Sequence, residues 1–219
     1  EALKAYAPFV DLWMTSVYDV QKRFGRWDDI LAEPAPPDFL PITNAIWHAH
    51  RAIAFAAKKD FSGAAREHDL FRSAKAAIPE DSVFGQDSAH RILDVSDLFI
   101  EGEIALQKGE WERAAKLLEK AAEVEDGLWY GEPPAWLQPV RHTLGAMYLK
   151  SGQFSKAERV YRKDLNKWRN NGWSLFGLSR ALERQDKHEE AARIKAQYDH
   201  VWQKADERTK TSCKCIPVT

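Results

Sequence analysis

LGAMYLKSGQFSKA, residues 144–157, is the stretch that decides the fold of this chain. In it, the small residue Gly145 is followed three positions later by the aromatic Tyr148. A second glycine, Gly152, precedes another aromatic, Phe154, by two positions. Two helices approach closely only where the side chains at their crossing are small, and glycine readily adopts the left-handed conformation that ends many helices. The stretch therefore predicts two antiparallel helices joined by a tight turn.

The same pattern recurs at four other places in the sequence. With Ala157 as the reference position, the equivalent Ala191 lies 34 residues downstream. Upstream, the equivalents are Ala114 in KGEWERAAKLL, Ala64 in KKDFSGAARE and Ile30 in FGRWDDIL, at successive intervals of 43, 50 and 34 residues. A helical hairpin cannot bury its apolar face alone, so repeated hairpins stack on one another. The recurrence predicts an all-α solenoid in which two intervals carry insertions.

The spacing L-G-x2-Y … A-x3-aromatic resembles the tetratricopeptide repeat (TPR), whose period is about 34 residues. The pieces EPPAWLQPVRHTLGA, GQFSKAERVYRKDL and NGWSLFGLSRAL resemble the C-terminal part of bacterial multi-repeat TPR proteins, and so do FGRWDDILAEPAPP and IWHAHRAIAFAA nearer the start. The resemblance implies a TPR-like α-solenoid of about five antiparallel helical hairpins, and it brings no catalytic residues with it. The sequence departs from the pattern at KWRNNGW, which stands where a proline usually precedes the last hairpin.

The repeat register also predicts how the chain is divided. Residues 1–208 are expected to form the helical array, and residues 209–219 a flexible C-terminal tail. The two insertions, residues 80–89 and 126–138, are expected to be loops, because their prolines and glycines interrupt the helical pattern. No segment has the alternating pattern of a β-strand.

Composition indicates an ordinary globular protein, with 44% hydrophobic and 30% charged residues. No apolar run reaches the length of a membrane span, and no signal-peptide pattern is present. Because the body of the chain lacks cysteine, we expect a soluble cytoplasmic protein. The chain opens with Glu1 inside a repeat-like pattern, so we expect it to be a piece of a longer protein. A targeting segment before residue 1 is compatible with this expectation.

Charge is distributed unevenly along the chain. Residues 1–140 carry 15 Lys+Arg and 24 Asp+Glu, a net charge of −9, whereas residues 141–219 carry 17 and 9, a net charge of +8. Such asymmetry is typical of an interaction surface or of end-to-end association, although helices with differently composed outer faces would also produce it. No cluster of basic and aromatic residues marks a nucleic-acid groove.

A solenoid of this kind binds partners on its concave face, which the first helix of each hairpin lines. The insertion before the fourth hairpin adds tryptophans, Glu132, Arg141 and His142 at the edge of that face, where they could clamp a ligand or a peptide carboxylate. The alternative is that the loop only fills a gap, with Arg141 paired to Glu132, and that the aromatic residues pack in the core. The candidate binding residues are Phe99, Glu103, Glu132, Arg141, His142, Trp173, Phe176 and Arg180.

Two pairs of residues raise the question of a metal site. Cys213 and Cys215 form a C-x-C pair whose thiolates could bind a soft metal, but no second pair accompanies them, so a pair without a metal is the simpler interpretation. His48 and His50 lie two positions apart on an expected helix and so face different sides, unlike the i, i+4 pairs of helical metal sites. We therefore expect no cofactor.

No nucleophile elbow, phosphate-binding loop, dinucleotide fingerprint or H-E-x-x-H motif is present. The sequence therefore predicts a non-enzymatic TPR scaffold that binds a protein or peptide, without nucleic-acid or membrane partners and with possible self-association. The second hypothesis is a small-ligand or metal-binding protein that uses the His/Glu/Trp cluster of residues 129–142 or the C-x-C pair. The third is an accessory domain of a larger enzyme.

Overall fold

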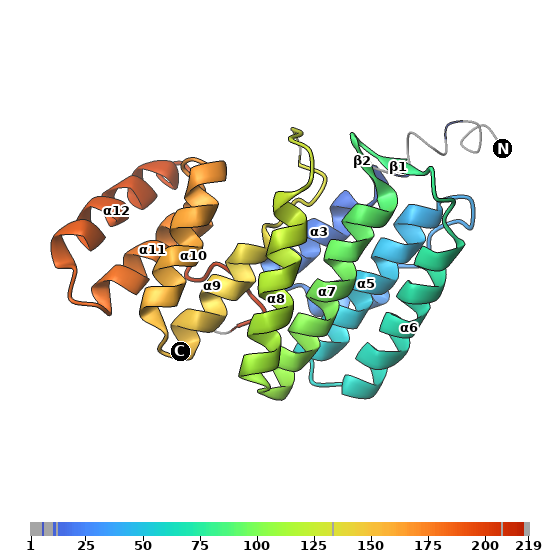
Figure 1. Ribbon diagram of the computed structural model, residues 1–219, viewed down its shortest axis with the longest axis horizontal. Helices are drawn as coiled ribbons and strands as arrows, with labels where there is room; N and C mark the ends of the chain where they lie inside the picture. Colours follow the sequence, from blue (N-terminus) through green and yellow to red (C-terminus); the bar gives the residue numbers. More distant parts are fainter. Residues whose placement is uncertain (1–5, 7–10, 12, 133, 207, 217–219) are drawn as a thin grey trace. The chain divides into compact units, whose positions relative to one another are not determined.

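The computed structural model describes residues 6, 11, 13–132, 134–206 and 208–216. Within these residues it contains ten helices and one two-stranded sheet (Figure 1). The all-α prediction is therefore confirmed, apart from this small sheet. No helix in the described part of the chain is both long enough and apolar enough to cross a membrane.

The chain divides into two compact units, Glu1–Gln138 and Pro139–Thr219. The sequence predicts a single helical array over both units. The boundary between them falls close to the position where the net charge of the sequence changes from negative to positive. In the described part of the first unit, the helices form three hairpins, and α5 packs against α3, α4 and α7 as well as against its own partner. The hairpins are α3 (Ser16–Phe24) with α4 (Trp27–Ala32), α5 (Pro41–Ala57) with α6 (Phe61–Ala77), and α7 (Ala89–Lys108) with α8 (Trp111–Asp126).

The second unit contains two further hairpins. They are α9 (Val140–Lys150) with α10 (Phe154–Lys167), and α11 (Gly172–Glu183) with α12 (His188–Val201). The two first helices, α9 and α11, contact each other, and α10 packs between the hairpins against α11. The five predicted hairpins are therefore present in the described part of the chain.

All five hairpin turns share one backbone geometry. The residue at the turn adopts a left-handed conformation, with φ between 58° and 80°. Three of these positions are glycine, which adopts this conformation without steric cost; aspartate tolerates it better than most other residues, whereas lysine adopts it only at a steric cost. The second helix begins two positions later. The turn residues are Gly25, Lys59, Gly109, Gly152 and Asp186, and the helices after them begin at Trp27, Phe61, Trp111, Phe154 and His188.

Close helix packing in the second unit centres on Tyr161 of α10, which is completely buried. A Cβ atom added at Gly145 of α9 would lie 2.4 Å from the Cζ atom of Tyr161, and one added at Gly177 of α11 would lie 2.1 Å from the same atom. Neither helix could come this close to the ring with a larger residue. The prediction that Gly145 lies at a helix crossing is confirmed.

The first insertion differs from its prediction. The sequence predicts a loop without strands over residues 80–89, but Val83–Phe84 (β1) and Asp87–Ser88 (β2) form an antiparallel hairpin. Gly85, at the turn, has a φ of 66°, which suits the tight reversal. Each of these strands has only two residues. This is too short for the alternating pattern by which a strand is predicted from sequence.

The C-terminal segment turns back onto the second unit. Helix α12 ends at Val201 rather than near Arg208, and residues 211–213, 215 and 216 are buried. The hydroxyl of Ser212 donates a hydrogen bond of 2.8 Å to the carbonyl oxygen of His142 and lies 2.7 Å from the hydroxyl of Tyr161. The described part of the predicted flexible tail is thus packed against α9 and α10.

Candidate functional site

The structure does not bring the eight predicted binding residues together at one surface. Phe99 and Glu103, both on α7, are each 1% exposed and belong to the core of the first unit. The ring of Phe99 packs edge-on against Trp136, with the ring centroids 5.7 Å apart. Neither residue is accessible to a partner, because α7 turns this face inward.

Arg141 and His142 are buried as well, which corrects their predicted position at a groove edge. Nε2 of His142 lies 3.4 Å from a carboxylate oxygen of Asp164 on α10, and the same oxygen accepts a 2.5 Å hydrogen bond from Ser174 on α11. The aspartate thus lies between the serine and the histidine, so the histidine cannot activate the serine as a base would. These buried groups instead tie α9, α10 and α11 together.

The other predicted residues of the second unit lie nearer its surface. Trp173 packs edge-on against Trp202, with the ring centroids 5.0 Å apart. Phe176 and Arg180 line a pocket of about 260 Å³ together with Lys150 and Arg184. The guanidinium of Arg184 lies over the ring of Phe154 at 4.5 Å, and Arg180 pairs with the half-buried Glu183 at 2.6 Å. The pocket therefore combines aromatic walls with three basic side chains.

The C-terminal segment forms one wall of this pocket, through Thr211, Ser212 and Ile216. Beside it, Cys213 and Cys215 are joined by a disulfide, and both are 5% exposed. Disulfide sulfurs are not the thiolates that bind soft metals, so the C-x-C metal site requires the reduced form and stays a prediction. The disulfide also differs from the expectation of a reducing compartment.

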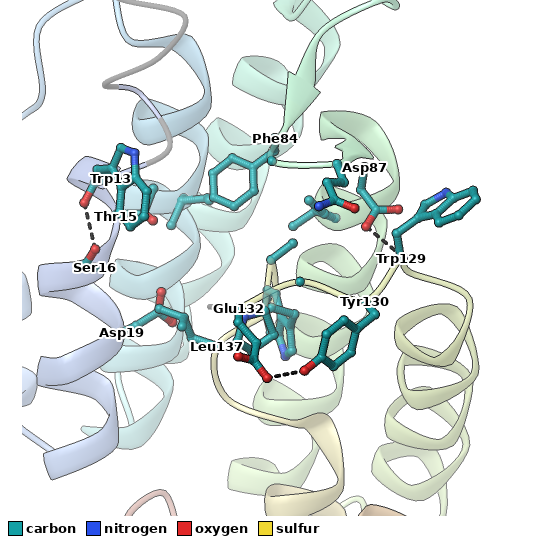
Figure 2. Close-up of a pocket in the computed structure, with 18 of the residues that line it drawn as sticks. Trp13, Thr15, Ser16, Asp19, Phe84, Asp87, Trp129, Tyr130, Glu132 and Leu137 are labelled. Atoms are coloured by element: carbon teal, nitrogen blue, oxygen red, sulfur yellow. Dashed lines mark hydrogen bonds between the residues drawn. The ribbon is translucent and has the colours of Figure 1, made fainter. Parts of the chain in front are cut away.

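A second pocket, of about 200 Å³, lies in the first unit (Figure 2). Segments far apart in the sequence form it: the region around α3, the β1–β2 hairpin and the loop between α8 and Gln138, together with residues of α5 and α7. Phe84 and Trp136 are the buried aromatic residues of its wall, whereas Trp129 and Tyr130 are 68% and 62% exposed at its rim. Burial of Trp136 thus anchors this loop.

The loop residues around this pocket are held by specific hydrogen bonds. The backbone N–H of Trp129 donates to the buried carboxylate of Asp87 at 2.9 Å, which ties the loop to β2. Glu132 is exposed and accepts a hydrogen bond from the hydroxyl of Tyr130 (Figure 2). This bond to a carboxylate raises the pKa of Tyr130. Glu132 thus lies at a pocket, but at this one rather than in the predicted clamp.

A buried charge network supports the α3 side of the same pocket. Asp19 lies 3.4 Å from the ammonium of Lys22 and 3.3 Å from Nε2 of His50. Burial raises the pKa of Asp19, but the charge of Lys22 and the hydrogen bond from His50 outweigh it and lower the pKa to about 2. Burial lowers the pKa of Lys22, whose ammonium lies over the rings of Phe99 and Trp136 at 5.3 and 5.0 Å.

The histidines near these sites are engaged by single carboxylates. His48 contacts Glu67 at 2.7 Å, whereas His50 faces Asp19, so the two have different partners, as their spacing indicates. A separate group of possible metal ligands, His68, Asp97 and Glu101, has ligand atoms within 4.8 Å of one another. Arg72 pairs with both carboxylates of that group, so a guanidinium already compensates their charge.

Comparison with known proteins identifies the repeat. A family model described as "Tetratricopeptide repeat" matches residues 142–172, which span most of α9, all of α10 and the turn after it. The chain contains a tetratricopeptide repeat. The prediction of a TPR protein is confirmed, and this segment includes the whole of the stretch 144–157 from which the prediction was made. No curated protein matches the chain.

Two crystal structures share the TPR-like fold. Both contain the nearly identical TPR-like repeats of a putative kinesin light chain from Podosopora anserina, one of them with a single substitution. Each is 13% identical to this chain, with a TM-score of 0.52. The alignments cover 89% and 90% of this chain and 97% and 98% of those chains. At this identity the similarity concerns the fold alone, which for TPRs generally serves protein–protein interaction.

Sequence analysis missed the pocket of the first unit and most of the charges beside it. Asp19 and Phe84 carry no motif, and His50 was considered only together with His48 for a metal site; the three residues lie in separate segments of the chain. The one signal was the proline- and tryptophan-rich loop 126–138. Sequence analysis singled out this loop but assigned it to a site with Arg141 and His142.

Proposed function

We propose that this TPR protein is a non-catalytic binding module, and that its second unit binds an acidic segment of a partner protein in the pocket on α9 and α11. The observation that carries the proposal is the set of basic side chains around that pocket, Lys150, Arg180 and Arg184, beside the aromatic rings of Phe154 and Phe176. Carboxylates are recognised by guanidinium groups through charge-assisted hydrogen bonds. The net charge of the second unit, +8 over residues 141–219, attracts the same partners from a distance.

The position of the pocket supports a peptide rather than a small metabolite. It lies on the first helices of two successive hairpins, which are the helices expected to line the binding face of a solenoid. One of its walls is the C-terminal segment, an irregular stretch of chain that is already accommodated on this face. A partner segment would lie beside that stretch, with acidic side chains towards Arg180 and Arg184.

The test is a selection of displayed random peptides on the whole chain, with counter-selection on the double variant Arg180→Glu, Arg184→Glu. We expect the enriched peptides to be acidic and to lose at least about tenfold in affinity for the double variant, because charge pairs across an interface become repulsions. Arg193→Glu, on the exposed face of α12, is the matched charge-reversal control and should bind normally. Enrichment of basic peptides, or equal binding to the double variant, would reject the proposal.

A further inference from the structure

We propose that the pocket of the first unit binds the cationic side chain of a lysine or arginine in a partner polypeptide. This site lies in the other unit from the acidic-segment site and has the opposite charge preference, so it does not depend on the function proposed above. It gives a chemical identity to the ligand that the sequence predicts for the loop of residues 126–138.

The size of the pocket limits its occupant. Pockets for drug-sized molecules have volumes of roughly 300–1,000 Å³, whereas this one has about 200 Å³. A single amino-acid side chain is the size of group that such a volume accepts. Its wall is largely aromatic, since Trp13, Phe84, Tyr130 and Trp136 all line it, so the aliphatic stem of a long side chain would find apolar surface there.

The charge of the pocket selects a cation. Asp19, Asp87 and Glu132 line it, and no lysine or arginine is among the described residues that line it. Lys22 and His50 already compensate Asp19. Asp87 is 2% exposed, and its Oδ1 atom has no hydrogen bond, with the nearest cation, Arg91, at 3.6 Å. Glu132, at the rim, keeps a carboxylate whose partner is a phenol rather than a cation.

The aromatic wall and the carboxylates of the pocket together favour a cation over other ligands. The faces of aromatic rings attract cations, and a carboxylate beside them adds to that attraction. An anion would be repelled by the carboxylates of Asp87 and Glu132, and a purely apolar group would remove water from them without providing a hydrogen bond in return. A side chain with an apolar stem and a cationic end satisfies both parts of the pocket.

The surroundings of the pocket indicate a polypeptide as the carrier of that side chain. Trp13, Trp129 and Tyr130 are 50%, 68% and 62% exposed around it, and Figure 2 shows the ring of Trp129 pointing outward from the pocket. Exposed tryptophan and tyrosine side chains are typical anchors of protein interfaces. They provide contact area for residues on either side of the bound lysine or arginine, which a free ammonium ion would not use.

The binding test uses the whole chain and follows the indole N–H signals of Trp13, Trp129 and Trp136 by NMR, assigned with tryptophan-to-phenylalanine variants. The titrants are the N-acetyl amides of lysine and arginine, the N-acetyl amide of norleucine as the uncharged equivalent, and methylammonium as the free cation. We expect saturable shifts with the lysine and arginine amides, and weaker binding of the other two. Equal binding of norleucine amide would reject a cation site, and equal binding of methylammonium would reject the polypeptide side chain as its occupant.

Two variants connect the binding to the pocket. Both Glu132→Gln and Tyr130→Ala change exposed residues, so neither should disturb folding. Each should weaken binding of the cationic amides about twofold to fivefold, the effect of losing one exposed charge or cation–π contact. Glu112→Gln and Trp111→Ala, at exposed positions of α8, are the matched controls and should leave it unchanged. Unaltered binding by both pocket variants, or no saturable shift in the parent, would overturn the proposal.

Discussion

Tyr161 organises the second unit at the scale of single residues. Its ring fills the space that Gly145 and Gly177 leave open on two neighbouring helices, and its hydroxyl reaches Ser212. Because burial raises the pKa of Tyr161, the phenol stays neutral far into the alkaline range. One side chain therefore joins α9, α10, α11 and the C-terminal segment.

The first prediction concerns the two glycines that face this ring. Gly145→Ala or Gly177→Ala would place a Cβ atom within 2.4 Å of the ring of Tyr161, so we expect each to destabilise the protein by about 1–3 kcal/mol, the usual cost of overpacking. Chemical denaturation measures this loss. If the clash causes the destabilisation, Tyr161→Leu should lower the free energy of unfolding less in the Gly145→Ala background than in the parent protein. A parent-like denaturation midpoint for both alanine variants would contradict the packing described here.

Asp19 carries the second prediction, which concerns acid stability. Its pKa is lowered from 3.8 to about 2 in the folded protein, so the ionised carboxylate stabilises the fold at pH values above about 4. This contribution, about 2 kcal/mol from the size of the shift, is lost as the pH falls towards 2. Asp19→Asn lacks it at every pH.

The measurement is the free energy of unfolding of the parent and of Asp19→Asn between pH 2 and pH 6. We expect the parent to be the more stable of the two near neutral pH, because the variant leaves the buried Lys22 without its partner. The difference should shrink as the pH falls through the folded-state pKa of Asp19. A difference that does not change with pH would show that the Asp19 charge makes no contribution.

At the scale of structural elements, the C-terminal segment behaves as part of the helical core. Ser212 is 2% exposed, and its hydroxyl links the carbonyl oxygen of His142 to the hydroxyl of Tyr161. The third prediction is that Ser212→Ala lowers the stability of the protein by about 1–3 kcal/mol, because it leaves buried polar groups unsatisfied. Lys214→Ala, at the exposed position of the same segment, should have little effect. Equal melting temperatures for the two variants would mean that the segment does not contribute to folding.

The elements also show which parts of the structure the sequence could predict. Each hairpin turn has a left-handed residue two positions before the aromatic residue or histidine that begins the next helix, and this local pattern recurs at the start of α4, α6, α8, α10 and α12. Periodic patterns of this kind are local, so sequence alone reveals them. The β1–β2 hairpin and the loop at Trp136 follow no period, because they fill the space that the insertions create.

The candidate sites were less predictable for a related reason. Repeat register assigned Phe176 and Arg180 to the binding face, and in the structure both line the pocket of the second unit. The same register predicted His142 and Arg141 at the edge of a groove, but both are buried. It could not show that His142 of α9 contacts Asp164 of α10, which also accepts a hydrogen bond from Ser174 of α11. The pocket of the first unit depends on contacts across more than a hundred residues, between Trp13 and Trp136, which no local pattern encodes.

At the scale of the whole molecule, the division into two units coincides with the division of charge. Because Pro139 and Val140 are uncharged, the first unit carries 15 Lys+Arg and 24 Asp+Glu, and the second carries 17 and 9. The whole chain has a net charge of only −1, so two copies do not repel each other strongly. A chain of this kind can lower its electrostatic energy when the acidic unit of one copy meets the basic unit of another.

The fourth prediction is therefore that the protein self-associates weakly at low salt and separates as salt is added. At an ionic strength of about 0.01 M, charges interact over about 30 Å, whereas at about 1 M this falls to about 3 Å. Sedimentation velocity over a range of protein concentrations would show an average mass that rises with concentration in the first condition only. Reversing basic charges of the second unit, as in the Arg180→Glu, Arg184→Glu variant, should weaken the association. An average mass that is independent of both salt and concentration would show that the opposite charges of the two units serve other partners.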